Sequence, residues 1–143
     1  MKAMRLKFRG RRKSDGKLVY GYYWQNESGN HFIRTLWDED GVTSGIFDHE
    51  IDPETVCQCT GIKDDNGKEI YEGDIIKITI RSWDRTGRNL HTGYYLVEYK
   101  NGKFGVVFRD KHLTTLDSFH NTTIEKVGNV FENPEMLNEA MTQ

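Results

Sequence analysis

Apolar and polar residues alternate over short stretches along most of this 143-residue chain, which is the pattern of half-buried β-strands. In the clearest stretch, Ile76, Ile78 and Ile80 predict one buried face, while Lys77 and Thr79 alternate with them on the other. The same reasoning predicts further strands at residues 4–8, 17–24, 31–37, 42–51, 93–99, 103–109 and 122–131. We therefore expect a mainly β protein.

Turn signals separate these strands. Asn66-Gly67 and Asn101-Gly102 each predict a type I′ hairpin turn, because both residue types tolerate a positive φ. The polar stretch Arg81–His91 predicts a long hairpin loop. Near the end of the chain, Asn133 as N-cap and Pro134 at the first helical position predict a short helical turn within residues 134–140.

Asp52-Pro53 closes the first group of strands and suggests a division of the chain. We expect residues 1–53 to form an N-terminal β meander in which Ile46 and Phe47 are buried. Residues 54–143, with strands linked by tight hairpins, are expected to form a small, strongly bent SH3-like β-barrel or roll. Whether the N-terminal half shares the core of the barrel stays open at this point.

The stretch Thr60–Lys77, TGIKDDNGKEIYEGDIIK, resembles the signature of the YopX family, found mostly in phages and prophages. Val97–Tyr99 and Gly128–Glu135 agree with this resemblance, which covers residues 54–137 most clearly. The resemblance implies a mainly β protein with an SH3-like roll that often self-associates and has no established activity. It implies no catalytic residues that could be transferred to this chain. A phage or prophage accessory protein in the bacterial cytoplasm is the corresponding expectation.

Charge argues against a general affinity for nucleic acid, because the formal net charge is only −2. The cations are concentrated near the N-terminus, and the candidates for nucleic-acid contact there are Arg9, Arg11, Arg12 and Lys13. The alternative is that these charges lie on a solvated edge strand and block pairing with other sheets.

Aromatic residues are numerous, with seven tyrosines, seven phenylalanines and three tryptophans. Trp83, Tyr94 and Tyr95 exceed what one face of a small roll needs to bury. They are expected either to cover a second core between the two halves or to form an interface for a homo-oligomer.

Recognisable reactive groups are scarce. Cys57 and Cys59 have no second pair at zinc spacing, and the acidic groups Asp38–Asp40 and Asp48–Glu50 are more typical of turns than of a cation site. The stretch containing His112, Asp117 and His120 lacks a nucleophile motif, so a hydrolase there is only a residual hypothesis.

Asp64, Asp65 and Asn66 do not follow the spacing of a calcium loop. We expect no enzyme activity, metal, cofactor, small-molecule substrate, signal peptide or membrane span. The leading hypothesis is a self-associating binding module, and the alternative is a nucleic-acid-binding module that uses the basic arm.

Overall fold

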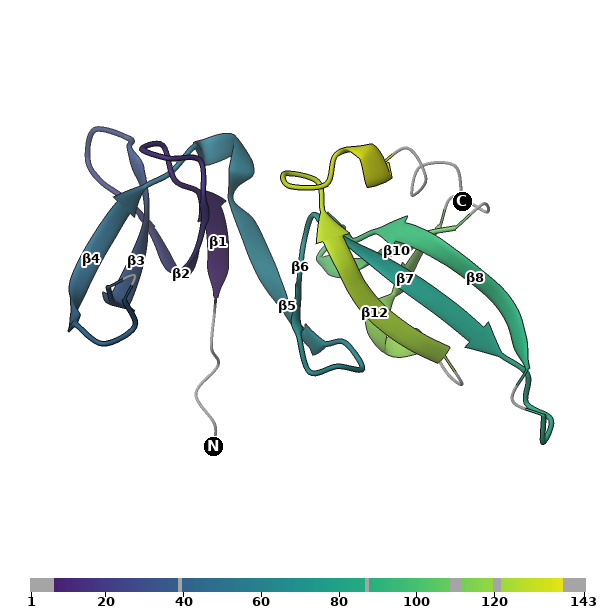
Figure 1. The fold of residues 1–143 in the computed structure, drawn as a ribbon. Helices are drawn as coiled ribbons and strands as arrows, with labels where there is room; N and C mark the ends of the chain where they lie inside the picture. The colour runs from purple at the N-terminus through teal and green to yellow at the C-terminus, as the bar shows by residue number, and fades with distance from the viewer. Residues whose placement is uncertain (1–6, 39, 87, 109–111, 120–121, 138–143) are drawn as a thin grey trace, which may run out of the picture. The chain divides into compact units, whose positions relative to one another are not determined.

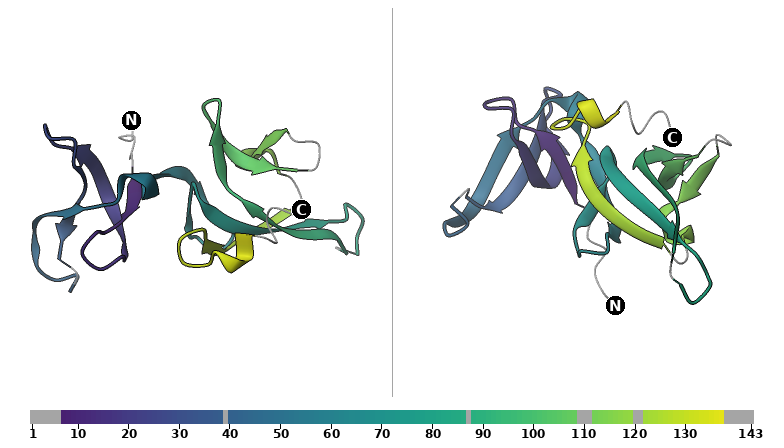
Figure 2. Two further views of the ribbon diagram at one scale, coloured as in Figure 1. Left: turned by 90° about the horizontal axis from the view of Figure 1, so that it is seen from above. Right: turned by 45° about the vertical axis from the view of Figure 1, so that its right-hand side comes forward.

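The computed structural model describes residues 7–38, 40–86, 88–108, 112–119 and 122–137. The mainly β prediction is confirmed, because antiparallel sheets account for most of these residues (Figures 1 and 2). Contacts divide the chain into two compact units, residues 1–59 and 60–143, six residues beyond the expected boundary. The strands of the first unit are β1 (Phe8–Arg11), β2 (Leu18–Gln25), β3 (His31–Trp37), β4 (Ser44–Glu50) and the start of β5 (Cys57–Lys63), with the 3₁₀ turn η1 (Pro53–Thr55).

The first unit is a succession of antiparallel strands in the order β4-β3-β2-β1, with the start of β5 on the other side of β1. The sheet curls, so that the end of β4 meets the end of β1. Arg12 bridges Ile51, and the Asp52 N–H donates to the Arg11 carbonyl at 2.9 Å. The outer edge of β4 is left unpaired over Ser44–Asp48 within the described residues.

The inner face of this unit packs around Ile33 and Ile51, which are fully buried. Gly10 lies directly against Ile51, since a Cβ there would approach the Ile51 Cδ1 atom to 2.5 Å. The prediction that Ile46 is buried is wrong. Ile46 is 66% exposed because β4 is an edge strand and this side chain lies on the outer face.

The second unit contains the β12-β7-β8 sheet, the β11-β10-β9 sheet and the end of β5 with β6. Its remaining elements are β6 (Glu69–Tyr71), β7 (Asp74–Arg81), β8 (Asn89–Leu96), β9 (Glu98–Lys100), β10 (Lys103–Val107), β11 (Leu113–Thr115), η2 (Leu116–Ser118) and β12 (Thr122–Asn129). Its buried core consists of Ile70, Ile76, Ile78, Tyr95, Val97, Val106 and Leu116. The predicted buried face of β7 is therefore confirmed at Ile76 and Ile78, with Ile80 packed against it.

The two Asn-Gly pairs form different turns. Asn101 and Gly102 have φ values of 52° and 78°, as the predicted type I′ turn between β9 and β10 requires. In the other pair only Gly67 has a positive φ, 81°, so the type I′ prediction is wrong there. The Gly67 N–H donates to the Asp64 carbonyl, and Asp64 N–H donates to Lys68, which makes a longer hairpin loop.

Two other predicted elements differ from expectation, one loop and one strand. The loop predicted at 81–91 is shorter, because β7 continues to Arg81 and β8 begins at Asn89. The predicted strand at 93–99 divides at Val97, whose N–H donates to the Asp74 carbonyl.

The start and end of the chain are described only in part. Residues 4–6 of the first predicted strand lie outside the described residues, and β1 begins at Phe8. The helical turn is present at 135–137, and the rest of its predicted range lies outside the described residues. Asn133 does not cap this turn with its side chain, which instead accepts a hydrogen bond from Asn129 N–H at 3.2 Å. No helix in the described part of the chain is long and apolar enough to cross a membrane.

Candidate functional site

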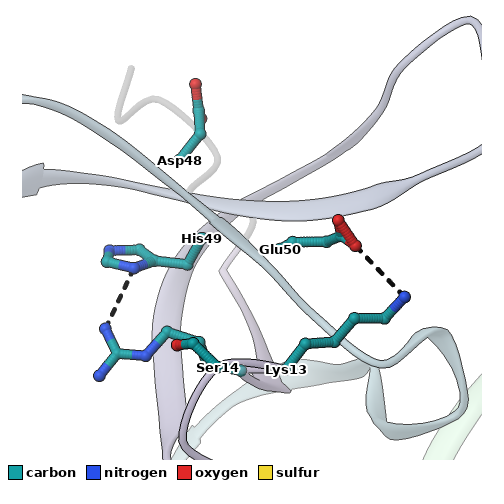
Figure 3. A pocket seen from close by; sticks show the side chains of 6 residues that line it. Lys13, Ser14, Asp48, His49 and Glu50 are labelled. Atoms are coloured by element: carbon teal, nitrogen blue, oxygen red, sulfur yellow. Dashed lines mark hydrogen bonds and ion pairs between the residues drawn. The ribbon is translucent and has the colours of Figure 1, made fainter.

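An open hollow of about 500 Å³ lies on the first unit, between the turn after β1 and the end of β4. It is lined by Arg12, Lys13, Ser14, Asp48, His49 and Glu50. Figure 3 shows Lys13 extended toward the Glu50 carboxylate, with a distance of 3.2 Å between the charged atoms. The Lys13 N–H also donates to the Glu50 carbonyl at 2.9 Å, so both ends of this lysine hold the turn against β4.

His49 forms the inner wall of the hollow and links three elements. Arg12 can only donate, so its contact of 3.2 Å with Nδ1 of His49 makes that nitrogen the acceptor. The proton of the neutral ring then lies on Nε2, which donates to the Thr35 hydroxyl at 3.2 Å. Thr35 in turn donates to the Trp37 carbonyl at 3.1 Å. Through these bonds His49 links the turn after β1 to β3 and β4.

The four predicted nucleic-acid contacts lie in different environments. Arg9 is fully buried, so the prediction of a surface phosphate contact is wrong for this residue. The alternative of an edge strand is wrong as well, because β1 pairs with β2 on one side and β5 on the other. Arg11 donates through Nε to the Gly16 carbonyl at 2.8 Å.

Arg12 forms a fork with the carboxylate of Asp15, and the Nε–Oδ1 distance is 2.9 Å. Hydrogen bonds from Arg12, followed by that of the Lys17 N–H, hold the pKa of Asp15 well below its ordinary value. Lys13 is paired with Glu50. A phosphate at the hollow would therefore have to displace an acid from each of its two cations.

In the part of the chain that the structure describes, the other polar residues considered as candidate metal or hydrolase sites are not brought together. No group of three or more His, Cys, Asp or Glu side chains in the described ranges could hold a metal ion. Cys57 is buried and Cys59 is partly exposed, and no disulfide joins them. Ser118 is hydrogen-bonded to Thr115, and His120 lies outside the described residues.

The three aromatic residues predicted to form an interface differ in their exposure to solvent. Tyr95 is only 3% exposed, which agrees better with a role in a core than with a role in an interface. It pairs with Ile76 across the β7–β8 ladder and packs on Phe108 at 4.7 Å, which places it on the core face of the sheet. Tyr94 is half-buried, and Trp83 is 79% exposed.

A different set of apolar side chains is exposed on the first unit. We call it the β2–β4 face, and it consists of Tyr20, Tyr22, Leu36 and Ile46, which are 42%, 58%, 48% and 66% exposed. Tyr22 pairs with Arg34 across β2 and β3, and Arg34 pairs with Asp48 across β3 and β4. Residues directly opposite, or two apart along a strand, share a face, which places the four apolar side chains on one surface.

The centre of the β2–β4 face is ordered and neutral. Arg34 donates two hydrogen bonds to the Asp48 carboxylate, at 2.9 and 3.0 Å, and lies 5.4 Å from the ring centre of Trp24. These bonds lower the pKa of Asp48, and the Trp24 Nε1–H adds a third at 2.9 Å. The sequence carried a signal for this face in Tyr20, Tyr22 and Trp24 at intervals of two, but it could not show that the opposite face holds the core.

In the second unit, Asp64 ties the hairpin loop at 64–68 to β12. Its carboxylate accepts backbone hydrogen bonds from Asn66 and Lys68 at 2.9 and 2.8 Å, and from Lys126 at 2.9 Å. Asp65 also binds β12, because its N–H donates to the Ile124 carbonyl at 3.0 Å. These acids therefore have a turn-forming role, as their spacing predicted.

A second junction surrounds the buried carboxylate of Asp74. It accepts from the Tyr71 N–H at 2.7 Å and forms an ion pair with Lys126 at 3.2 Å. Lys126 also donates to the Glu69 carbonyl and lies 5.5 Å from the ring centre of Tyr71. The polar groups of the stretch 64–74 thus hold β5, β6, β7 and β12 together.

The fold is that of an antiparallel β protein with two compact units. In the second unit, the polar residues of the stretch 64–74 have a structural role, because they connect neighbouring strands. The chain belongs to the YopX family: residues 7–138 match the family described as YopX protein. No curated protein is significantly similar to the chain.

Solved structures give the same fold. The crystal structure of protein EF1440 from Enterococcus faecalis has 23% sequence identity and a TM-score of 0.55, and the match covers 94% of this chain and 99% of that chain. Protein yopX from Bacillus subtilis has 21% identity and a TM-score of 0.59, with 90% and 95% covered. At these identities the likeness shows the fold alone.

Proposed function

We propose that this YopX-family chain is a non-enzymatic binding module of a phage or prophage that works in the bacterial cytoplasm and assembles with copies of itself. The observation that carries the proposal is the β2–β4 face, where large apolar side chains from three neighbouring strands are exposed together. Such a face is more than scattered surface hydrophobicity, and exposed apolar patches of this kind commonly mark protein contacts.

The charge of the face suits a second copy of the same chain. A twofold interface brings a patch against itself, so an unbalanced charge would face its own equivalent. On the β2–β4 face, Arg34 is already neutralised by Asp48, and contact between two copies therefore brings no net repulsion.

The exposed area is also of the right order. With about 150–250 Å² for a whole aromatic side chain, the exposed fractions correspond to roughly 400 Å² of apolar surface per copy. Two such patches with a polar rim reach the ~1,000 Å² expected of a specific interface. The unpaired edge of β4 at Ser44–Asp48 adds backbone groups that a neighbouring strand could bind.

Sedimentation velocity across micromolar concentrations tests this proposal. We expect the wild type to sediment above the 16.7 kDa of one chain and Ile46→Asp to sediment as a monomer, because the new charges would meet across the interface. Leu90→Asp is the matched control, since Leu90 is similarly exposed at 58% but lies on β8. A monomeric wild type, or equal effects of the two substitutions, would overturn the proposal.

The absence of enzyme activity and an SH3-like roll in the second unit are parts of the same proposal. The bonding of His49 supports the first, because both of its ring nitrogens serve to connect strands. The short antiparallel strands and the tight turn at Asn101-Gly102 support the second. A panel of hydrolase substrates with wild-type protein and His49→Ala tests the first part, and turnover that is lost in His49→Ala would refute it.

A further inference from the structure

The hairpin that joins β7 to β8 carries exposed side chains that neither the fold nor the proposed self-association uses. Thr122, the first residue of β12, pairs with Ile80, and β7 and β8 continue beyond it as a two-stranded ribbon. Figures 1 and 2 show this ribbon projecting past the end of β12. We call its end, residues 81–86 and 88–91, the hairpin tip.

The tip presents an indole ring to solvent. Trp83 is 79% exposed and is the most exposed of the large hydrophobic residues in the described part of the chain. Local bonds connect the described residues on both sides of it: Ser82 N–H donates to the Arg88 carbonyl at 2.7 Å, and Thr86 donates to the Asp84 carboxylate through its N–H and its hydroxyl. Such bonds reduce the conformational entropy that the backbone loses when the tryptophan binds a ligand.

Three arginines lie within five residues of Trp83 in the sequence. Arg81, Arg85 and Arg88 are exposed, and with Asp84 as the one acid among residues 81–91 the formal charge of the tip is +2 (three arginines minus one aspartate) in a chain of net charge −2. The structure pairs neither Arg85 nor Arg88 with an acid in the ranges it describes. In the first unit, by contrast, Arg12, Lys13 and Arg34 each have a carboxylate partner.

We propose that the hairpin tip binds single-stranded nucleic acid, with Trp83 stacked on a base and Arg85 and Arg88 against neighbouring phosphates. Stacking requires an unpaired base whose ring face is accessible, which favours a single strand over a duplex. Guanidinium groups that have no acid partner are suited to bind phosphate. Binding to a membrane is less well supported, because the exposed apolar surface of the tip consists of Trp83 and Leu90 and is narrower than the apolar face of a membrane-bound segment.

The sheet behind the tip offers a continuation of the same site. Lys77 and Tyr94 pair across β7 and β8 on the face opposite the core, and Arg81 lies on the same side of β7 by alternation. A strand that leaves Trp83 along the hairpin would therefore meet a cation and a second aromatic ring.

Fluorescence anisotropy with a labelled mixed-sequence DNA 20-mer, and with RNA of the same sequence, tests the proposal on the full chain. Trp83→Ala should weaken binding about 5- to 150-fold, the range expected for one lost base stack. Arg85→Ala/Arg88→Ala should weaken binding and reduce the slope of log K against log salt by about 1.4, because each phosphate contact to a single strand contributes about 0.7. The relative affinities for DNA and RNA identify which of the two the tip prefers.

Controls match the number and type of side chains removed. Trp37→Ala removes another exposed tryptophan, 57% exposed, from the first unit. Lys13→Ala/Lys100→Ala removes two surface charges that have glutamate partners. Both should bind like the wild type, and quenching of indole emission by the oligonucleotide should be smaller in Trp83→Ala than in Trp37→Ala.

Four outcomes would overturn the proposal. They are no binding at about 50 mM salt, equal losses in tip and control variants, tighter binding of a duplex of the same length, and binding only to vesicles of anionic lipid. None of these outcomes depends on the oligomeric state. Nucleic-acid binding at the tip can therefore be refuted while self-association is confirmed, and self-association can be refuted while nucleic-acid binding is confirmed.

Discussion

Replacing Asp64 by alanine removes a side chain that accepts hydrogen bonds from both the 64–68 loop and β12. The loop amides of Asn66 and Lys68 belong to exposed residues and regain hydrogen bonds with water, so their loss is modest. The amide of Lys126 lies in a strand and is left without its acceptor, which costs about 1–3 kcal/mol. Together we expect the free energy of unfolding of the second unit to fall by about 3 kcal/mol.

Thermal unfolding followed by circular dichroism measures this change. A loss of about 3 kcal/mol should lower the melting temperature by more than about 10 °C in a unit of this size. Hydrogen exchange should localise the effect, with faster exchange in β12 and the 64–68 loop than in the first unit. Because the two units can unfold separately, the exchange data decide which transition belongs to the second unit.

Two variants sharpen the test. Asp64→Asn keeps one acceptor oxygen but turns an amide group toward the other partners, so its loss should be intermediate. Asp117→Ala removes an exposed carboxylate from η2 and should change stability by less than about 0.5 kcal/mol. If Asp64→Ala were as stable as Asp117→Ala and exchange in β12 were unchanged, the argument for this junction would be refuted.

Three further predictions concern pH, an ion pair and a glycine. Burial raises the pKa of Asp64, but the N–H donors of Lys126, Lys68 and Asn66 outweigh burial, and the pKa is lowered overall. The stabilisation by this carboxylate is therefore complete above its ordinary pKa of 3.8 and is lost as the pH falls below that value. In urea unfolding between about pH 5 and pH 2, Asp64→Asn should therefore lose less stability than the wild type, and identical pH profiles would contradict this. Lys126→Met removes the cation that pairs with the buried Asp74 carboxylate and should lower the free energy of unfolding by about 2–4 kcal/mol in chemical denaturation. An unchanged midpoint of denaturation would contradict this prediction. Gly21→Ala would place a Cβ 2.2 Å from the Arg34 carbonyl oxygen and should lower the free energy of unfolding by at least about 3 kcal/mol. A melting temperature equal to that of the wild type would contradict this, because it would mean that β2 and β3 can move apart there at little cost.

Alternation predicted the parts of the fold that depend on neighbouring residues. Ile76 and Ile78 were correctly assigned to a buried face because a strand with period two has only two faces, and the more apolar one packs inward. Asn101-Gly102 was correctly assigned because its turn involves no group outside the hairpin.

The incorrect predictions depend on residues far away in the sequence. Asn66-Gly67 has the same local signal as Asn101-Gly102, but Asp64 reaches β12, 62 residues away, and a different turn results. Arg9 and Ile46 were misplaced because burial follows from whether a strand is central or at an edge, and from which face is covered. The hollow and the β2–β4 face depend on the same long-range pairings, so neither could be read from local patterns.

The junction around Asp64 and Asp74 also bears on how this family should be studied. Within the stretch that makes a YopX-family chain recognisable, Asp64 and Asp74 are buried, and their carboxylates accept hydrogen bonds from the chain's own backbone. Two chains that share this stretch should therefore share a scaffold while presenting unrelated outer surfaces. Swapping outer strands or hairpin tips between such chains, with the stretch 60–77 kept intact, should transfer binding behaviour without disturbing folding.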